Sequence, residues 1–271
     1  MMILDSEFYD KVQPFDLLMY SGTGIISSTI RAAQGKMLGN SEFSHVDIVV
    51  TSEVLPQIPQ LKPGRKYTLG SNLVIPLLTD GVKDVRTNTT KLGVQIRDLE
   101  EVVNKFYAKN QGNYICWCPL LDNPWVKSEK QRKKIIEDMT SFIAQFGFKP
   151  YERNFLDILG RIHKGARKIN LQIEEKIVDG IKVLSTVGLV DRVESRDIQS
   201  NSFSCVEIVV MIYQVIGVLS MKLDPREVAP VHFVTKESPL PKVISDPVEI
   251  ISTGSRKLQR RKSLKDIVLG L

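Results

Sequence analysis

Two stretches decide the fold: SHVDIVV at residues 44–50 and SFSCVEIVVMIYQ at residues 202–214. In the first, a polar loop gives way to an apolar run, which predicts that His45 begins a β-strand. In the second, a polar lead-in precedes a long apolar segment, which predicts that Cys205 begins a helix. His45 and Cys205 form the one pairing in this sequence that is typical of a reaction centre.

The chemistry of this pair follows from its two contexts. A thiol at a helix N-terminus lies at the positive end of the macrodipole, which favours the thiolate. An imidazole beside it can act as a base or as a stabilising cation. Taken alone, a cysteine on an apolar helix is more often a small buried hydrophobe, and a histidine at a strand start is usually a hydrogen-bonded polar residue. Together, the two contexts favour a catalytic pair.

Outward from these stretches, glycine and proline mark the element boundaries. We expect strands at residues 14–21, 44–51, 66–75 and 93–97, helices at 98–109 and 123–146, a helical block at 154–187, and an extended segment at 231–234. Asn123 and Pro124 form a good helix start, with Asn as the cap and Pro in the first turn. Lysines and arginines in the middle of this helix indicate a solvated face rather than a binding site.

Composition and charge exclude several classes of protein. With 42% hydrophobic and 25% charged residues, the chain of 271 residues is typical of a soluble globular protein. Nearly all of its net charge of +6 comes from residues 252–271, which contain six lysines and arginines but only one aspartate. Because the body is close to neutral, a nucleic-acid partner is not expected.

Three cysteines cannot form a fully paired disulfide framework, so we expect a reducing, cytoplasmic setting. The N-terminal residues lack the basic and apolar regions of a signal peptide. Cys116 and Cys118 have no second ligand pair at zinc-site spacing, so we predict no metal and no cofactor. The apolar run at 203–219 is interrupted by Glu207 and Gln214, which favours a buried helix over a membrane span.

A family resemblance rests on the order of motifs. Residues 16–50 give a strand, a short Gly break, a helix carrying Arg31, a small-residue turn and then Ser-His-Val-x-Ile-Val-Val. This resembles the circularly permuted branch of the NlpC-type papain-like superfamily, the YiiX-like proteins, which includes the lecithin:retinol acyltransferase relatives. Three further stretches, in the same order, are also similar: residues 93–103, 149–154 and 203–213. The resemblance covers about half the chain.

The resemblance implies an α+β fold in which a small antiparallel sheet packs on the helix bearing the cysteine. Residues 10–235 would form one permuted papain-like domain with a helical insertion at 122–197, followed by an extended basic arm at 236–271. Cys205 would be the nucleophile, and His45 its base and later general acid.

The third member of the site is where the sequence departs from the family. Members often carry a glutamate or another polar group on the next strand, and this position aligns with Gly70. Strand alternation places Asn72 on the face of Gly70, so Asn72 is the first candidate to orient His45 and Ser71 is the second. Asp47 shares a strand face with His45 and could contact the site, although most strand aspartates near an edge are simply solvated.

The implied function is a thiol hydrolase or acyltransferase that cleaves amide or ester bonds in peptide, amide or lipid acyl substrates. The alternative is a catalytically weak or inactive papain-like protein that serves as a structural component, motivated by Gly70, the insertion and the arm. Large DNA viruses carry proteins similar to this branch, so such a component could be virion-associated. The arm's basic and apolar residues alternate, which suits a protein or membrane-surface partner; the alternative is a disordered basic end.

Overall fold

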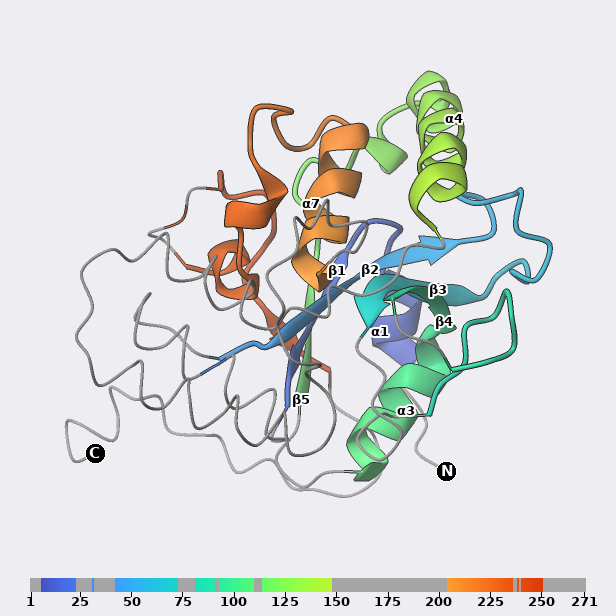
Figure 1. The fold of residues 1–271 in the computed structure, drawn as a ribbon, viewed down its shortest axis with the longest axis vertical. Coiled ribbons are helices and arrows are strands. Elements are labelled where there is room, and N and C mark those ends of the chain that lie inside the picture. Colours follow the sequence, from blue (N-terminus) through green and yellow to red (C-terminus); the bar gives the residue numbers. More distant parts are fainter. Residues whose placement is uncertain are drawn as a thin grey trace, which may run out of the picture.

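A computed structural model describes residues 6–22, 31, 42–72, 81–90, 93–109, 114–147, 204–235, 238 and 240–250. Within this part, a six-stranded antiparallel sheet and four α-helices form an α+β fold (Figure 1). The sheet order is β4-β3-β2-β1-β5-β6. The strands are β1 Leu17–Ser21, β2 His45–Thr51, β3 Lys66–Asn72, β4 Gly93–Asp98, β5 Tyr114–Cys118 and β6 Val248–Glu249. The helices are α1 Ser6–Lys11, α3 Leu99–Lys109, α4 Glu129–Phe146 and α7 Cys205–Val215.

Strand alternation sorts the sheet residues into two cores. Val46, Ile48 and Val50 of β2 belong to the larger core, which also contains the buried residues of α4 and α7. Val49 of β2 belongs to the smaller core with residues of α1 and α3. Because successive side chains point to opposite faces of a strand, this division places α7 against one face of the sheet and α3 against the other.

Helix α7 begins at Cys205, as predicted. The Ser204 side chain accepts a hydrogen bond from the Glu207 amide, and the Glu207 carboxylate accepts one from the Ser204 amide at 2.7 Å. This reciprocal capping box satisfies two of the amides that a helix start leaves without partners. Nine of the eleven residues of α7 are buried, so the helix forms the centre of the larger core.

Two predicted elements differ from the structure. Asn123 caps a short 3-10 helix, Pro124–Val126, and the α-helix begins only after Ser128, whose side chain accepts from the Gln131 amide. The Asn-Pro signal was therefore correct for a cap but wrong for the start of α4. Residues 231–234 were expected to be extended, but Pro230–Phe233 is a 3-10 helix closed by a hydrogen bond from the Ala229 amide to His232 Nδ1.

The sequence did not predict β5 or β6. β5 pairs with β1 on one side, and the two-residue β6 pairs with β5 on the other. Leu240, Ile244 and Ile250 are buried, so the beginning of the arm predicted at 236–271 packs as part of the fold. The helical block at 154–187 and the basic residues after 250 lie outside the described residues.

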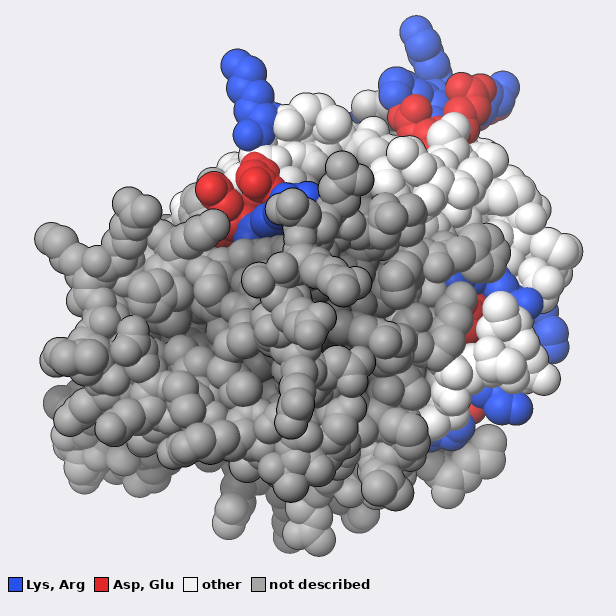
Figure 2. All heavy atoms as spheres, viewed as in Figure 1, with Lys and Arg blue, Asp and Glu red and all other residues white. Residues whose placement is uncertain are grey.

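Helix α4 lies at the beginning of the predicted insertion at 122–197. Its apolar side, which includes Ile135, Met139 and Phe142, packs into the larger core. On its outer side, lysines and acids stand next to one another (Figure 2), with ion pairs such as Lys134–Asp138. This mixed surface fits the solvated face predicted from the sequence. None of the described helices has the length and apolarity needed to cross a bilayer.

Candidate active site

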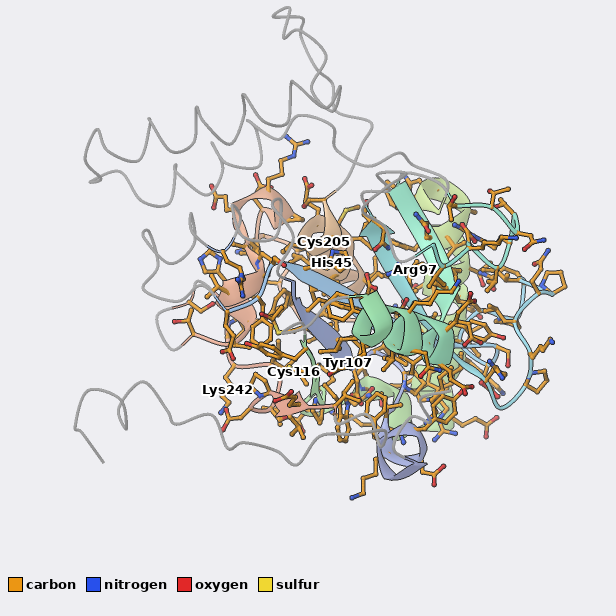
Figure 3. The ribbon with its side chains drawn as sticks, turned by 90° about the horizontal axis from the view of Figure 1, so that it is seen from below. His45, Arg97, Tyr107, Cys116, Cys205 and Lys242 are labelled. Atoms are coloured by element: carbon orange, nitrogen blue, oxygen red, sulfur yellow. The ribbon has the colours of Figure 1, made fainter. Side chains whose placement is uncertain are left out.

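The Cys205 and His45 side chains meet where the start of α7 lies over the start of β2 (Figure 3). Cys205 is 6% exposed, and the His45 side chain is 23% exposed. The His45 ring also lies 5.1 Å, between centroids, from the ring of Tyr20, its partner on β1. The two residues that the sequence pairs are therefore neighbours, and the imidazole retains access to solvent.

Asp47 fixes the orientation of the imidazole. It lies two residues after His45 on β2, so its side chain points to the same face. Its Oδ1 lies 2.9 Å from His45 Nε2. Since Nε2 is bound to the carboxylate, Nδ1 is the ring nitrogen available to the Cys205 thiol, and the interaction with Cys205 helps to raise the pKa of His45.

The carboxylate of Asp47 is fully buried and receives hydrogen bonds from two further strands. Its Oδ2 accepts from Tyr20 OH of β1 at 3.0 Å and from Arg97 Nη2 of β4 at 2.9 Å. Burial acts to raise the pKa of Asp47, but the positive charges of His45 and Arg97 outweigh it and hold this pKa well below its usual value. Asp47 is therefore a carboxylate at neutral pH.

The same contacts make His45 a cation. Burial acts to lower the pKa of His45, but the charge of Asp47 and the interaction with Cys205 outweigh it and raise this pKa to about 10. An imidazolium held between a carboxylate and a thiol is the arrangement that stabilises a thiolate.

The first turn of α7 supplies the remaining polar groups. Glu207 takes part in the capping box, and its Oε1 lies 3.9 Å from Arg226 Nε, so it is a structural residue rather than the base. In the described part of the chain, the amides of Cys205 and Val206 have no hydrogen-bond partner. Two amides at a helix start can bind developing negative charge next to the sulfur.

The prediction of Asn72 or Ser71 as the orienting residue requires correction, because Asp47 occupies His45 Nε2. Ser71 and Asn72 are both buried on β3. Asn72 Nδ2 has no hydrogen-bond partner among the described residues. The signal that could have found Asp47 was its spacing: an acid at i+2 from a strand histidine shares its face without any tertiary information.

Cys116 and Cys118 belong to β5 and have a different environment. Both are buried, and all three cysteines of the chain are free. Burial, with the charges of Glu42 and Glu249, raises the pKa of Cys116 to about 12, and burial raises that of Cys118 further. Within the described ranges no group of His, Cys, Asp and Glu side chains is placed to hold a metal ion.

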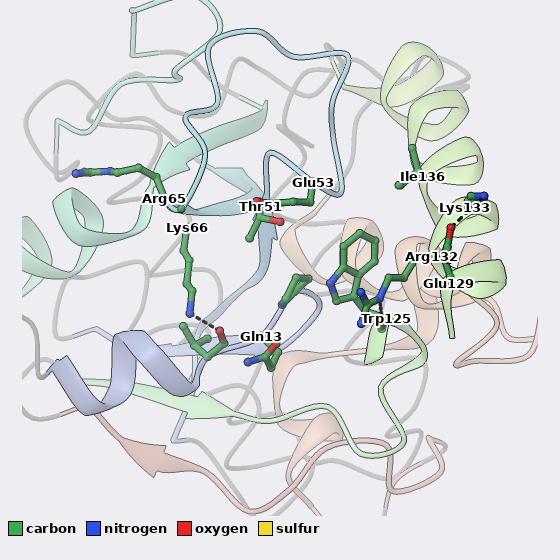
Figure 4. Close-up of a pocket in the computed structure, with 13 residues that line it drawn as sticks. Gln13, Thr51, Glu53, Arg65, Lys66, Trp125, Glu129, Arg132, Lys133 and Ile136 are labelled. Carbon is green, nitrogen blue, oxygen red and sulfur yellow. Dashed lines mark hydrogen bonds and ion pairs between the residues drawn. The ribbon is translucent and has the colours of Figure 1, made fainter. Parts of the chain in front are cut away.

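A cavity of about 520 Å³ lies away from this site, beside α4 and the segment before β3 (Figure 4). Its cations are already engaged by the protein. Lys66 Nζ donates to the Val12 carbonyl at 2.6 Å, and Arg132 Nε donates to the Trp125 carbonyl at 2.6 Å. The cavity is lined by neither Cys205 nor His45, so it is separate from the candidate active site.

Neither a model of a known protein family nor a curated protein sequence matches this chain.

Proposed function

We propose that the protein is a thiol hydrolase or acyltransferase of the permuted papain-like type, which cleaves amide or ester bonds with Cys205 as nucleophile. The observation that carries the proposal is the line of contacts from Asp47 through His45 to Cys205 at the start of a buried helix. A nucleophile, a base within hydrogen-bond reach and a third group that orients the base are the signature of covalent catalysis.

In the acylation step, the Cys205 thiolate attacks the substrate carbonyl carbon, and the carbonyl oxygen takes the electron pair. The amides of Cys205 and Val206 stabilise this oxyanion. His45 donates its Nδ1 proton to the leaving nitrogen or oxygen as the bond to carbon breaks. The products are an acyl-enzyme thioester and the free amine or alcohol.

In the deacylation step, His45 acts as the base. Its Nδ1 takes a proton from water, or from an acceptor alcohol or amine, as that group attacks the thioester carbon. The thiolate leaves, and the thiolate–imidazolium pair is restored. Asp47 remains ionised throughout and keeps Nδ1 directed at the reacting atoms. Peptides, other amides and lipid acyl groups all fit this chemistry.

Gly70 was one reason to consider a catalytically inactive component, because family members often carry the orienting residue at this position. Asp47 supplies a carboxylate to His45 from the neighbouring strand. Position 70 therefore no longer favours the inactive alternative, and no other described feature favours it over a hydrolase or acyltransferase.

The first test is the rate at which iodoacetamide alkylates Cys205 between pH 5 and pH 10, in the wild type and in His45→Ala. A matched background, Cys116→Ala/Cys118→Ala, leaves Cys205 as the only thiol. We expect a rate that is already high at pH 6 in the wild type and that becomes low and strongly pH-dependent without His45.

The second test is turnover. Acyl p-nitrophenyl esters of increasing chain length and a set of peptide p-nitroanilides would be offered to the wild type, Cys205→Ser and His45→Ala. Loss of a positioned acid–base group reduces turnover by about 10²–10⁴-fold. An alkylation rate indifferent to His45, together with any turnover that survives both substitutions, would refute the proposed function.

A further inference from the structure

Gly70 lies in β3 at a point where the backbone does not require glycine. It has no positive φ angle and pairs in regular antiparallel register with Gln95 of β4. A glycine in a strand interior weakens the strand, because it gains no side-chain packing and loses more conformational freedom. Glycine is therefore explained here by the lack of room for a side chain.

That space is occupied by the carboxylate of Asp47. A Cβ atom built on Gly70 would lie 1.8 Å from Asp47 Oδ1 and 2.8 Å from its Cγ. Oδ1 is the oxygen that binds His45 Nε2. Even an alanine at position 70 would therefore displace the oxygen that orients the imidazole.

The hydrogen bond between Asp47 and Arg97 also spans the strand that carries Gly70. β3 lies between β2, which carries Asp47, and β4, which carries Arg97. The bond from Arg97 Nη2 to Asp47 Oδ2 thus passes over β3, where a side chain at position 70 would intrude. The recess at Gly70 lets one carboxylate contact groups from three strands: His45 of β2, Tyr20 of β1 and Arg97 of β4.

We propose that Gly70 is a positioning residue of the candidate site, whose missing side chain creates the recess for the Asp47 carboxylate, and that a carboxylate carried by either position 47 or position 70 can orient His45. The two positions behave as one unit: an acid on β2 requires glycine on β3, and an acid on β3 requires a small residue on β2. The role of His45 in catalysis rests on the proposed function, whereas the steric relation between positions 47 and 70 does not.

The first experiment is an NMR titration of the His45 ring nitrogens in the wild type, Gly70→Ala and Asp47→Ala, with His45→Gln used for assignment. In the wild type we expect the ring to stay protonated until about pH 10. In both variants its midpoint should fall toward the value near 6.5 of a free histidine. A folded Gly70→Ala protein in which His45 titrates as in the wild type would overturn the proposal.

A double-mutant cycle covers the case in which Gly70→Ala folds poorly. Gly70→Ala should lower the melting temperature of the wild type but change that of Asp47→Ala much less, because alanine at position 47 leaves nothing for the new methyl group to displace. An equal loss in the two backgrounds would mean that the glycine serves the strand alone, and would overturn the steric relation.

The transfer of the acid tests the second half of the proposal. In Asp47→Ala/Gly70→Asp we expect the His45 midpoint to rise again above that of Asp47→Ala. A midpoint that stays near 6.5 would show that only β2 can carry the acid. These readouts concern the histidine ring and the fold, so an unreactive Cys205 would refute the proposed function while leaving this inference standing.

Discussion

Cys205 at the start of α7 and Cys116 on β5 are buried to nearly the same extent, with 6% and 5% of their surfaces exposed. Their electrostatic surroundings are opposite. Cys205 lies at the positive end of a helix beside a cationic imidazole, whereas Cys116 lies near two glutamates, Glu42 and Glu249. Burial, together with those negative charges, raises the pKa of Cys116 to about 12.

The comparison separates burial from reactivity. A buried thiol becomes inert when its surroundings are apolar or acidic, and it becomes a nucleophile only when cations and helix amides stabilise the thiolate. The three cysteines therefore allow a comparison within one protein, because identical thiol groups have different electrostatic surroundings.

The largest expected effect is the selectivity of alkylation. With a pKa of about 12, only about one Cys116 side chain in 10⁵ is a thiolate at pH 7. We expect iodoacetamide to modify Cys205 at least about 10³-fold faster than Cys116 or Cys118. Peptide mass spectrometry of time points from wild-type protein measures all three rates at once. Comparable rates at the three positions would remove the contrast on which the comparison rests.

The next effect is the pH dependence of stability that His45 confers. Its pKa is raised in the folded protein, so its stabilising contribution is fully present below about pH 6.5 and is lost as the pH rises through about 10. The difference in unfolding free energy between the wild type and His45→Gln should therefore shrink by a few kcal/mol from pH 6 to pH 10.5. Urea unfolding at several pH values measures it, and a difference independent of pH would contradict the charged state of His45.

A smaller effect is expected for Asp47→Asn. The amide keeps the shape of the carboxylate but removes the charge that holds His45 as a cation, so Cys205 loses part of its advantage over Cys116. We expect the alkylation rate of Cys205 at pH 7 to fall by about 10–100-fold. Asn72→Ala is the matched control, because Asn72 is buried on the neighbouring strand but is not the residue bound to His45 Nε2. A larger loss in Asn72→Ala than in Asp47→Asn would restore the expectation from the sequence.

The smallest effect concerns the helix end. Ser204→Ala removes the side chain that caps the Glu207 amide and should cost about 1 kcal/mol of unfolding free energy. Because it loosens the first turn of α7 and leaves β5 untouched, it should slow alkylation of Cys205 while leaving Cys116 unchanged. Thermal unfolding and the same alkylation assay measure both effects. Unchanged stability would mean that Glu207 alone holds the cap.

The elements that carry His45 and Cys205 could be predicted because their signals are local. The apolar run that predicts β2 begins directly after His45, and the Ser204–Glu207 cap lies within two residues of Cys205. The strand β4 followed directly by the helix α3 could likewise be predicted from one continuous stretch of sequence. Such elements form largely where their own residues dictate.

The i+2 spacing places Asp47 on the face of His45, but its selection over Asn72 and Ser71, like the pairing of the outer strands, depends on contacts that sequence patterns do not contain. From the sequence alone, Asp47 is expected to be solvated. In the structure, β3 and β4 place Gly70 and Arg97 beside it. β5 is a five-residue strand that contains two cysteines and a tryptophan, and β6 exists only through its pairing with β5. Whether a short segment forms a strand depends mainly on its neighbours across the sheet, so strands such as β5 and β6 cannot be predicted from their own residues alone.

The burial of α7 has a consequence for motion. The helix that begins with Cys205 also forms the centre of the larger core, and the hydroxyl of its Tyr213 donates to the Phe15 carbonyl at 2.8 Å. Core helices open to solvent only in the rarest, near-global fluctuations, whereas lids and binding loops open often. Amide hydrogens in the middle of α7 should therefore exchange at the slowest rates in the protein. The sulfur of Cys205, the proposed nucleophile, thus lies at the start of a helix that forms part of the core, and we expect any adjustment to a bound substrate to come from the elements around it.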